Sequence, residues 1–406
     1  MDLLRNSKVG AVALTVAASA GIAFAATSSA KTESPALSAH AASISATSFT
    51  NTFSAMSQLK SVAAAGKGGI TAILPDTTSS DRYVDFDAPY LKEAALDAGI
   101  PSSDINVVNG QGSDSTFLSD AKTAISDGAK VLLIDPEDSG VGLEVETYAA
   151  SHNVKVINYD RLVLGGPADD YVSFNNVQVG KLIGQGFEAC VSAWGVKHPN
   201  VIMMRGAPTD NNATLFWDGY YNDVLESKFK SGAYTDLVNT AGTWNPTSPA
   251  PDALQEFETA YTAHPTANSA VIPNDENGAP IITYLKSKGI KPHTFPTTGQ
   301  DATPPGIDNI LSGYQCGTVY KPIYKEAEAA IALAVYLRAG KTPPASLLNG
   351  TTTDPTNKKS VPSVLLTPEW VTASTVKSTV IADKFIKPSQ ICTGTYKADC
   401  TKYGIS

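Results

Sequence analysis

The chain has 406 residues, of which 42% are apolar and 17% charged, and its formal net charge is -9. Because a single core stops growing at about 250–300 residues, two domains are expected. The apolar fraction excludes disorder of the whole chain, and the acidic balance argues against a general nucleic-acid binder and against docking on anionic lipid.

The first residues carry the three parts of a secretory signal peptide. Arg5 and Lys8 form a basic start, the following run is uncharged and mostly apolar, and residues 23–25 (Ala-Phe-Ala) resemble a cleavage site. The apolar run is shorter than the roughly 20 residues of a membrane span, so an N-terminal anchor helix is the less favoured alternative. We predict a signal peptide over residues 1–25 and export to the periplasm or the cell surface. No cysteine near the cleavage site offers a lipid anchor.

A regular α/β pattern begins after residue 66. Residues 26–66 are predicted to be an Ala/Ser/Thr-rich spacer that ends in a short helix. Short apolar runs then alternate with longer helical patterns, which is typical of βαβ units and a parallel sheet. Strands are expected over residues 70–75, 104–108, 130–135 and 154–159, and helices over 88–98, 115–126 and 142–151.

The alternation restarts beyond residue 176 and predicts a second, similar lobe. Helices are expected over residues 177–194, 213–229, 253–263, 278–288 and 324–339, and strands over 200–205, 236–239, 269–272, 294–298, 317–320 and 361–366, with a loop over 340–359. The fold class is therefore α/β, with two Rossmann-like lobes.

The four cysteines fit an exported protein, since an even number in an oxidising compartment favours disulfides. Three pairings are possible. We favour Cys392 with Cys400, which are close in sequence, and hence Cys190 with Cys316. Zinc is the alternative, but the five histidines are scattered and no CxxC motif occurs, so no metal site is expected.

Charged and amide side chains follow nearly every predicted strand, where ligands of open α/β sheets bind. Each sugar hydroxyl both donates and accepts, so carboxylates and amides can accept from it while Arg, Lys and amide N–H donate to it. Tyr83 could cover the apolar face of a sugar ring. Taken singly, each Asp or Asn could instead be a turn residue or helix cap. The whole set favours a neutral polyol ligand.

Short segments that occur in a fixed order carry a family resemblance. They are residues 80–83, 158–161, 171–180, 206–213, 273–276, 298–302 and 317–323. As an ordered set over about residues 68–370, they resemble the periplasmic sugar-binding proteins of ABC importers, in the D-xylose-binding branch of the ribose/galactose group.

The resemblance implies the type I periplasmic binding protein fold, with lobe 1 over residues 67–176 plus 322–366 and lobe 2 over 177–321 plus 367–406. Three crossovers are expected near residues 175–177, 320–322 and 366–368, and a bound sugar would favour hinge closure. A membrane permease would read the closed form; we expect a monomer without a cofactor. The implied sugar contacts are Arg82, Tyr83, Asp160, Arg161, Asp210, Asn212, Trp244, Asn274, Asp301 and Lys321.

One segment departs from the family pattern. Xylose binders carry a stacking tryptophan shortly before a helix of lobe 2, and the best register places Ser248 there, with Trp244 a few residues earlier. Either Trp244 reaches the pocket by another loop path or one stacking face is missing. The departure leaves another pentose or a hexose (ribose, arabinose or glucose) as alternatives to D-xylose.

Three rival functions use similar residues. A secreted glycoside hydrolase needs paired carboxylates, but the site aspartates neighbour Arg or Asn, which is expected to lower rather than raise their pKa values. A transcription regulator needs an N-terminal helix-turn-helix, and the signal and spacer occupy that position. A sensor that presents sugar to a membrane receptor would use the same pocket. Residues 110–115 lack the third glycine of GxGxxG, so no nucleotide site is expected.

Overall fold

The computed structural model describes residues 44–78, 80–207, 209–239 and 251–405. The predicted signal peptide and most of the predicted spacer lie outside the described residues. Where the described chain begins, Ile44, Phe49 and Met56 are buried in the main apolar core. A 3-10 helix, Ser54–Leu59, continues directly into α1 (Lys60–Ala65). Residues 44–50, which composition assigned to the spacer, are therefore packed, because isolated apolar side chains among polar neighbours anchor them.

The first α/β series forms a seven-stranded sheet, called here the large sheet. Its strands are β1 (Gly69–Leu74), β2 (Ile105–Asn109), β3 (Ala129–Ile134), β4 (Lys155–Tyr159), β5 (Asp170–Phe174), β10 (Gly350–Thr353) and β11 (Ser360–Leu366). The order is β10-β11-β5-β4-β3-β1-β2, and all neighbours run parallel except β10 and β11. The sequence missed β5 and expected β10 to be loop. β5 is buried at every position, so it carries no amphipathic alternation.

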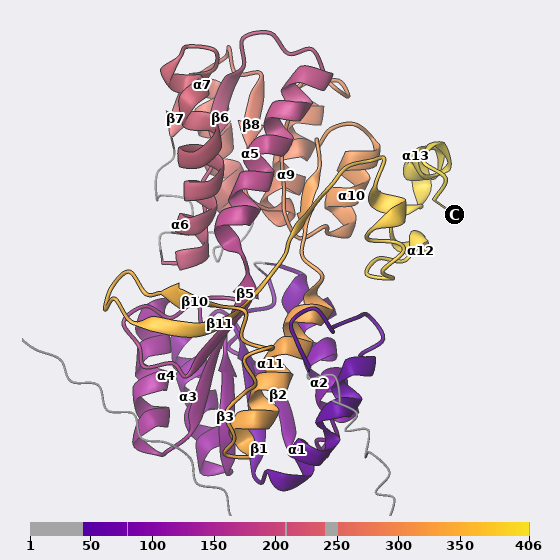
Figure 1. Ribbon diagram of the computed structural model, residues 1–406. Helices are drawn as coiled ribbons and strands as arrows, with labels where there is room; N and C mark the ends of the chain where they lie inside the picture. The colour runs from indigo at the N-terminus through magenta and orange to yellow at the C-terminus, as the bar shows by residue number, and fades with distance from the viewer. Residues whose placement is uncertain (1–43, 79, 208, 240–250, 406) are drawn as a thin grey trace, which may run out of the picture. The chain divides into compact units, whose positions relative to one another are not determined.

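Helices cover both faces of the large sheet (Figure 1). One face packs against α2 (Ala88–Asp97) and α11 (Ile323–Arg338), and the other against α3 (Asp114–Ser126) and α4 (Ser139–Ser151). Helices α3 and α4 each begin where a polar side chain accepts a hydrogen bond from a free backbone N–H group of the first turn. Ser113 Oγ caps α3, and Asp138 Oδ1 caps α4. The large sheet and these four helices form the large lobe.

The second series forms a three-stranded parallel sheet, the small sheet. Its strands, in the order β7-β6-β8, are β7 (Thr235–Asn239), β6 (Asn200–Met203) and β8 (Ser269–Val271). The helices around it are α5 (Asn176–Ala193), α6 (Asn211–Trp217), α7 (Glu226–Lys230), α8 (Pro251–Ala263), α9 (Asp275–Ser287) and α10 (Pro304–Leu311). The small sheet and these helices form the small lobe (Figure 1).

Two of these helices approach each other closely. α6 continues through a π-helical stretch, Asp218–Leu225, into α7, so the single helix predicted there is continuous but not regular. It packs along α5. A side chain at Gly180 would collide with the carbonyl oxygen of Phe216, so only glycine permits this contact.

The strand predicted over residues 294–298 is not a regular strand, which corrects the prediction. Pro296 has no N–H to donate to a neighbour, although its carbonyl accepts from Ala270 N at 3.0 Å. Thr298 Oγ1 takes the place of backbone pairing, because it donates to Ile272 O at 2.8 Å and accepts from Ile272 N at 2.9 Å. The segment nevertheless runs beside β8 and ends at the same edge of the small sheet.

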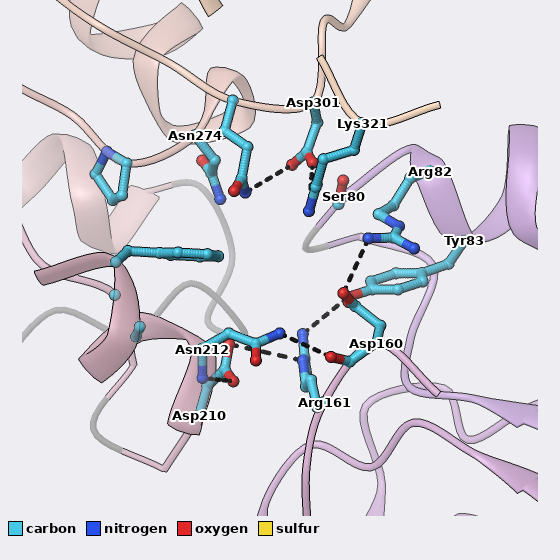
Figure 2. Close-up of a pocket in the computed structure, with 15 residues that line it drawn as sticks. Ser80, Arg82, Tyr83, Asp160, Arg161, Asp210, Asn212, Asn274, Asp301 and Lys321 are labelled. Atoms are coloured by element: carbon cyan, nitrogen blue, oxygen red, sulfur yellow. Dashed lines mark hydrogen bonds and ion pairs between the residues drawn. The ribbon is translucent and has the colours of Figure 1, made fainter. Parts of the chain in front are cut away.

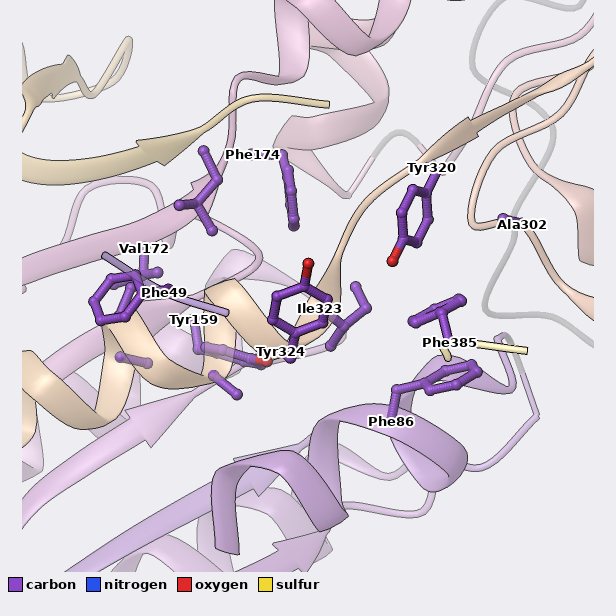
Figure 3. Close-up of a cluster of buried hydrophobic side chains, with 14 of the residues drawn as sticks. Phe49, Phe86, Tyr159, Val172, Phe174, Ala302, Tyr320, Ile323, Tyr324 and Phe385 are labelled. Carbon is purple, nitrogen blue, oxygen red and sulfur yellow. The ribbon is translucent and has the colours of Figure 1, made fainter. Parts of the chain in front are cut away.

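The chain passes between the two lobes at three places. β5 leads directly into α5, and β11 leads into β12 (Glu369–Val371), which pairs antiparallel with β9 (Thr318–Tyr320). The third passage runs from β9 into α11. These are the crossovers that the resemblance predicts. A continuous cluster of buried side chains that includes Phe174, Tyr320 and Ile323 lies beneath them (Figure 3).

Two disulfides hold the small lobe and the C-terminal region. Cys190–Cys316 ties α5 to the segment before β9, and Cys392–Cys400 links the short helices α12 (Pro388–Ile391) and α13 (Lys397–Lys402). The favoured pairing is thus confirmed. Among the described residues, no helix has the length and apolar character needed to cross a membrane.

Candidate functional site

One pocket collects nine of the ten predicted ligand-binding residues. Its volume is about 520 Å³ including the space open to solvent. The tenth residue, Trp244, lies outside the described residues. The lining comprises Ser80, Arg82, Tyr83, Asp160, Arg161, Gly206, Asp210, Asn212, Ala213, Phe216, Pro273, Asn274, Gln300, Asp301 and Lys321.

Both lobes supply the lining from the carboxyl ends of their strands (Figure 2). On the large-lobe side, Arg82 and Tyr83 lie in the connection after β1, and Asp160 and Arg161 directly follow β4. Their side chains converge because neighbouring parallel strands end at one edge of the sheet.

On the small-lobe side, the pocket residues stand at helix starts and strand ends. Asp210 and Asn212 lie at the N-terminus of α6, and Asn274 lies at that of α9. Asp301 follows the irregular segment beside β8, and Lys321 follows β9 at a crossover.

Arg82 is held by carboxylates behind the pocket. Its Nε and Nη2 donate to Asp87 at 2.9 and 2.8 Å, and Nη2 also donates to Glu326 at 2.7 Å. Nη1 faces Asp160 Oδ1 at 3.1 Å. Three carboxyl groups thereby fix the planar guanidinium of Arg82, which lines the pocket.

Arg161 lies beside two further buried carboxyl groups. It donates to Tyr83 Oη and to Pro136 O, each at 3.1 Å. Asp135 lies 3.6 Å and Glu137 3.7 Å from its guanidinium. Burial raises the pKa of Asp135 well above its usual value and that of Glu137 to about 8, although Arg161 partly offsets both shifts.

Asp160 stands at the centre of the charged groups. Its φ of 58° places it in the left-handed region, and its carbonyl accepts from Tyr171 Oη at 3.0 Å. Burial disfavours the charged carboxylate, but Arg82 and Lys321 outweigh burial and hold the pKa of Asp160 below its usual value. Asp160 is therefore an ionised acceptor, suited to a hydroxyl.

The small-lobe groups act as helix caps as well as pocket residues. Asp210 Oδ1 accepts from Asn212 N at 2.8 Å, while Oδ2 lies 3.7 Å from Arg161 Nε. Asn274 Oδ1 accepts from Asn277 N at 3.0 Å. Burial raises the pKa of Asp210 despite Arg161, so the expectation that a neighbouring Arg lowers the pKa of every site aspartate is wrong here.

Asp301 and Lys321 form an ion pair at the upper end of the pocket in Figure 2, where Asp301 Oδ1 and Lys321 Nζ are 2.9 Å apart. Asp301 has a φ of 88°, and its N–H donates to Val319 O at 2.9 Å. Gln300 Nε2 donates to the other carboxylate oxygen at 3.4 Å. The charges thus enter the pocket already paired, as buried charges must be.

The two lobes also touch each other directly across the pocket. Asn212 Nδ2 donates to Asp160 O at 3.1 Å, and Asn176 Nδ2, beside a crossover, donates to Asn212 Oδ1 at 2.7 Å. Arg161 of the large lobe also approaches Asp210 of the small lobe. The two lobes can therefore separate at the pocket only if these contacts break.

Sequence reasoning missed several contributors. Ser80, Phe216 and Gln300 line the pocket but were not assigned to it. Ser80 and Gln300 stand in the quoted family segments, so strand-end position was an available signal. Phe216 lies within a helical pattern and gave none. Among the described residues, no group of three or more His, Cys, Asp or Glu side chains is arranged to hold a metal ion.

Comparisons with known proteins agree with this geometry. A family model described as a periplasmic binding protein domain matches residues 70–342. The D-xylose-binding periplasmic protein of Escherichia coli (strain K12) is 35% identical over 287 residues, covering 70% of this chain and 82% of the relative. The multiple sugar-binding periplasmic receptor of Rhizobium radiobacter is 29% identical over 340 residues, covering 81% and 93%.

A solved structure shares the fold. The carbohydrate transporter solute-binding protein from Chloroflexus aurantiacus, in complex with D-glucose, superposes with a TM-score of 0.70 at 25% identity, covering 79% of this chain and 97% of that one. The type I periplasmic binding protein fold expected from the sequence is thereby confirmed.

Proposed function

The chain belongs to the periplasmic binding protein family, and we propose that it captures a monosaccharide, in the first place D-xylose, between its lobes and delivers it to an ABC import permease. Its relatives are solute-binding proteins, and the protein is a binding protein rather than an enzyme. Domain boundaries at residues 67–176 plus 322–366 and 177–321 plus 367–406 are part of the proposal, as are signal-peptide removal, export and a monomeric state.

The observation that carries the proposal is the convergence of paired charges and amides from both lobes on one pocket. Arg82, Asp160 and Arg161 face Asp210, Asn212, Asn274 and Asp301 across it. Ionised acceptors and fixed guanidinium donors match the hydroxyls of an uncharged sugar, each of which donates and accepts. A ligand that contacts both lobes stabilises the closed arrangement relative to any open one.

The choice of D-xylose rests on the relative of higher identity. The Escherichia coli protein is named for D-xylose, whereas the Rhizobium radiobacter receptor is named for multiple sugars and the Chloroflexus aurantiacus structure holds D-glucose. Another pentose or a hexose is therefore the alternative. Tyr83, whose hydroxyl is tied to Asp160 and Arg161, is the pocket ring on the large-lobe side that can cover the apolar face of a sugar.

Calorimetric titration with D-xylose, L-arabinose, D-ribose and D-glucose tests the proposal. We expect D-xylose to bind most tightly. L-Arabinose and D-ribose should bind at least tenfold more weakly, because each misplaces a hydroxyl and leaves a buried polar group without its partner. D-Glucose keeps the ring hydroxyls of D-xylose and adds a hydroxymethyl group, so it tests the room beside C5. Tighter binding of D-glucose than of D-xylose would show that the ligand is a hexose rather than a pentose. Absence of heat with every sugar would refute sugar binding, and release of product from aryl glycosides would favour a hydrolase instead.

A further inference from the structure

The C-terminal segment 376–386, called here the C-terminal strap, packs behind the pocket. It lies beyond residues 70–342, which match the family model. Val376, Val380, Phe385 and Ile386 are buried in the same core cluster as the crossover residues. The strap therefore belongs to the core at the junction of the lobes, although the family resemblance assigned residues 367–406 to lobe 2.

Asp383 of the strap binds two tyrosines that flank a pocket residue. Its Oδ2 accepts from Tyr320 Oη and from Tyr324 Oη, each at 3.0 Å. Lys321 stands between these tyrosines, where the chain crosses from β9 to α11. Burial, and next Asp383 itself, raise the pKa of both tyrosine hydroxyls, so both remain protonated donors. One carboxylate thus fixes the crossover on both sides of Lys321.

Phe385 connects the strap to the large-lobe side of the pocket (Figure 3). Its ring stacks on Phe86 with centroids 3.9 Å apart and planes at 13°, and it meets Tyr320 edge-on at 5.0 Å. Phe86 lies in the π-helical turn Tyr83–Asp87, which carries the pocket ring of Tyr83 and the Asp87 partner of Arg82. The strap therefore touches the supports of Arg82 and of Lys321 at once.

The two ends of the strap are anchored on other elements. It follows β12, which pairs with β9, and it leads into α12, which packs beside α10 of the small lobe. Asn51 Nδ2 of the N-terminal segment donates to Asp383 O at 2.7 Å. The strap thus joins the lobes in addition to the three crossovers.

We propose that Asp383 is a positioning residue of the ligand site, through which the C-terminal strap sets the place of Lys321 relative to Arg82. This inference rests on the proposed function. Without the carboxylate, Tyr320 and Tyr324 lose their common acceptor, and the crossover is free to shift. Lys321 then no longer meets Asp301 and the ligand in one fixed geometry, and sugar affinity falls.

The test is calorimetric titration of Asp383→Ala with the sugar that the wild type binds most tightly in the panel above. We expect affinity to fall about tenfold, which corresponds to about 1.4 kcal/mol, because Lys321 is no longer held in place. Asp236→Ala is the matched control, because Asp236 also accepts from a tyrosine hydroxyl, that of Tyr221 at 3.0 Å, but lies on β7 away from the pocket. It should leave affinity within about twofold.

A double-mutant cycle separates positioning from general stability. If Asp383 acts through Lys321, Asp383→Ala causes no further loss in a Lys321→Met background. Equal losses in both backgrounds, or unchanged affinity of Asp383→Ala, would overturn the inference. Should Asp383→Ala not fold, Tyr324→Phe removes one donor and keeps the ring; a loss of about threefold supports the inference and no loss overturns it. A wild type that binds no sugar would overturn the proposed function, and this inference with it.

Discussion

The two sides of the pocket hold their lining residues in different ways. On the large-lobe side, Arg82 and Arg161 are embedded among carboxylates, four of which lie behind the pocket lining. On the small-lobe side, Asp210 and Asn274 are N-caps whose oxygens accept from backbone N–H groups of α6 and α9. The large-lobe groups are thus part of a buried charge network, and the small-lobe groups are part of helix termini.

This difference predicts which side tolerates substitution. Removing a guanidinium leaves a buried ionised carboxylate, such as that of Asp160, without its countercharge, which disfavours folding strongly. Removing a cap leaves one backbone N–H without its acceptor, which costs much less. We therefore expect substitutions on the large-lobe side to lower both sugar affinity and the free energy of unfolding. Substitutions on the small-lobe side should lower sugar affinity with little loss of stability.

The largest effect is expected for Arg82→Ala. The variant removes the common partner of Asp87, Glu326 and Asp160. We expect the free energy of unfolding to fall by about 3–5 kcal/mol and sugar binding to be lost. Denaturant unfolding measures the first effect. Arg205→Ala is the control, since Arg205 lies over the Trp217 ring at 4.2 Å and should cost only about 1 kcal/mol. Equal losses in the two variants would contradict the network.

A smaller effect on stability is expected for Asn274→Ala. The variant loses the cap of α9, which lowers stability by about 1 kcal/mol. Because the same amide lines the pocket, sugar affinity should fall about tenfold. Ser113→Ala removes the cap of α3, which does not line the pocket, and should match the stability loss with affinity unchanged. If the two variants bind sugar equally well, Asn274 has no role in the site.

The last effect concerns pH, where the two sides meet. Burial, and next the charge of Asp81 on the large-lobe side, raise the pKa of Glu276 on α9 to about 8. In an open form Glu276 would titrate in the ordinary range, so closure takes up a proton. The closed form is then favoured at low pH, and sugar affinity should fall as the pH rises from about 5 to about 8 and level off above that.

Titration calorimetry over this pH range checks the expectation, with Glu276→Gln as the comparison because it cannot ionise. The variant should lose the pH dependence that Glu276 contributes. If sugar affinity depends on pH in the same way in the wild type and the variant, closure does not change the protonation of Glu276 beside Asp81.

The ligand-facing residues were predictable because parallel strands place their last residues at one edge. Asp160 and Arg161 became candidates because they end a buried apolar run, and the family resemblance selected them. Their supports could not. Glu326 is 244 positions from Arg82 and lies on α11, whose sequence reads as an ordinary buried helix. Only the fold brings the two charges together.

The fold itself was predictable where the hydrophobic period was regular. The segment 294–298 has the apolar pattern of a strand. However, Pro296 lacks an N–H, and the Thr298 side chain takes the place of regular backbone hydrogen bonds. Residues 44–50 resembled a spacer because the two large apolar side chains, Ile44 and Phe49, stand among small and polar neighbours. For residues 44–50, a tertiary contact that no local pattern encodes decided the outcome. For residues 294–298, the proline was a local signal against a regular strand that the apolar pattern outweighed.

The central claim is that one sugar binds both lobes and holds them together. Small-angle X-ray scattering of the wild type with and without saturating D-xylose tests it most directly. The account predicts a smaller radius of gyration with sugar, and no such change for Asp301→Asn, whose pairing with Lys321 is weakened. An unchanged radius in the wild type, at a sugar concentration at which calorimetry shows full binding, would contradict ligand-linked closure.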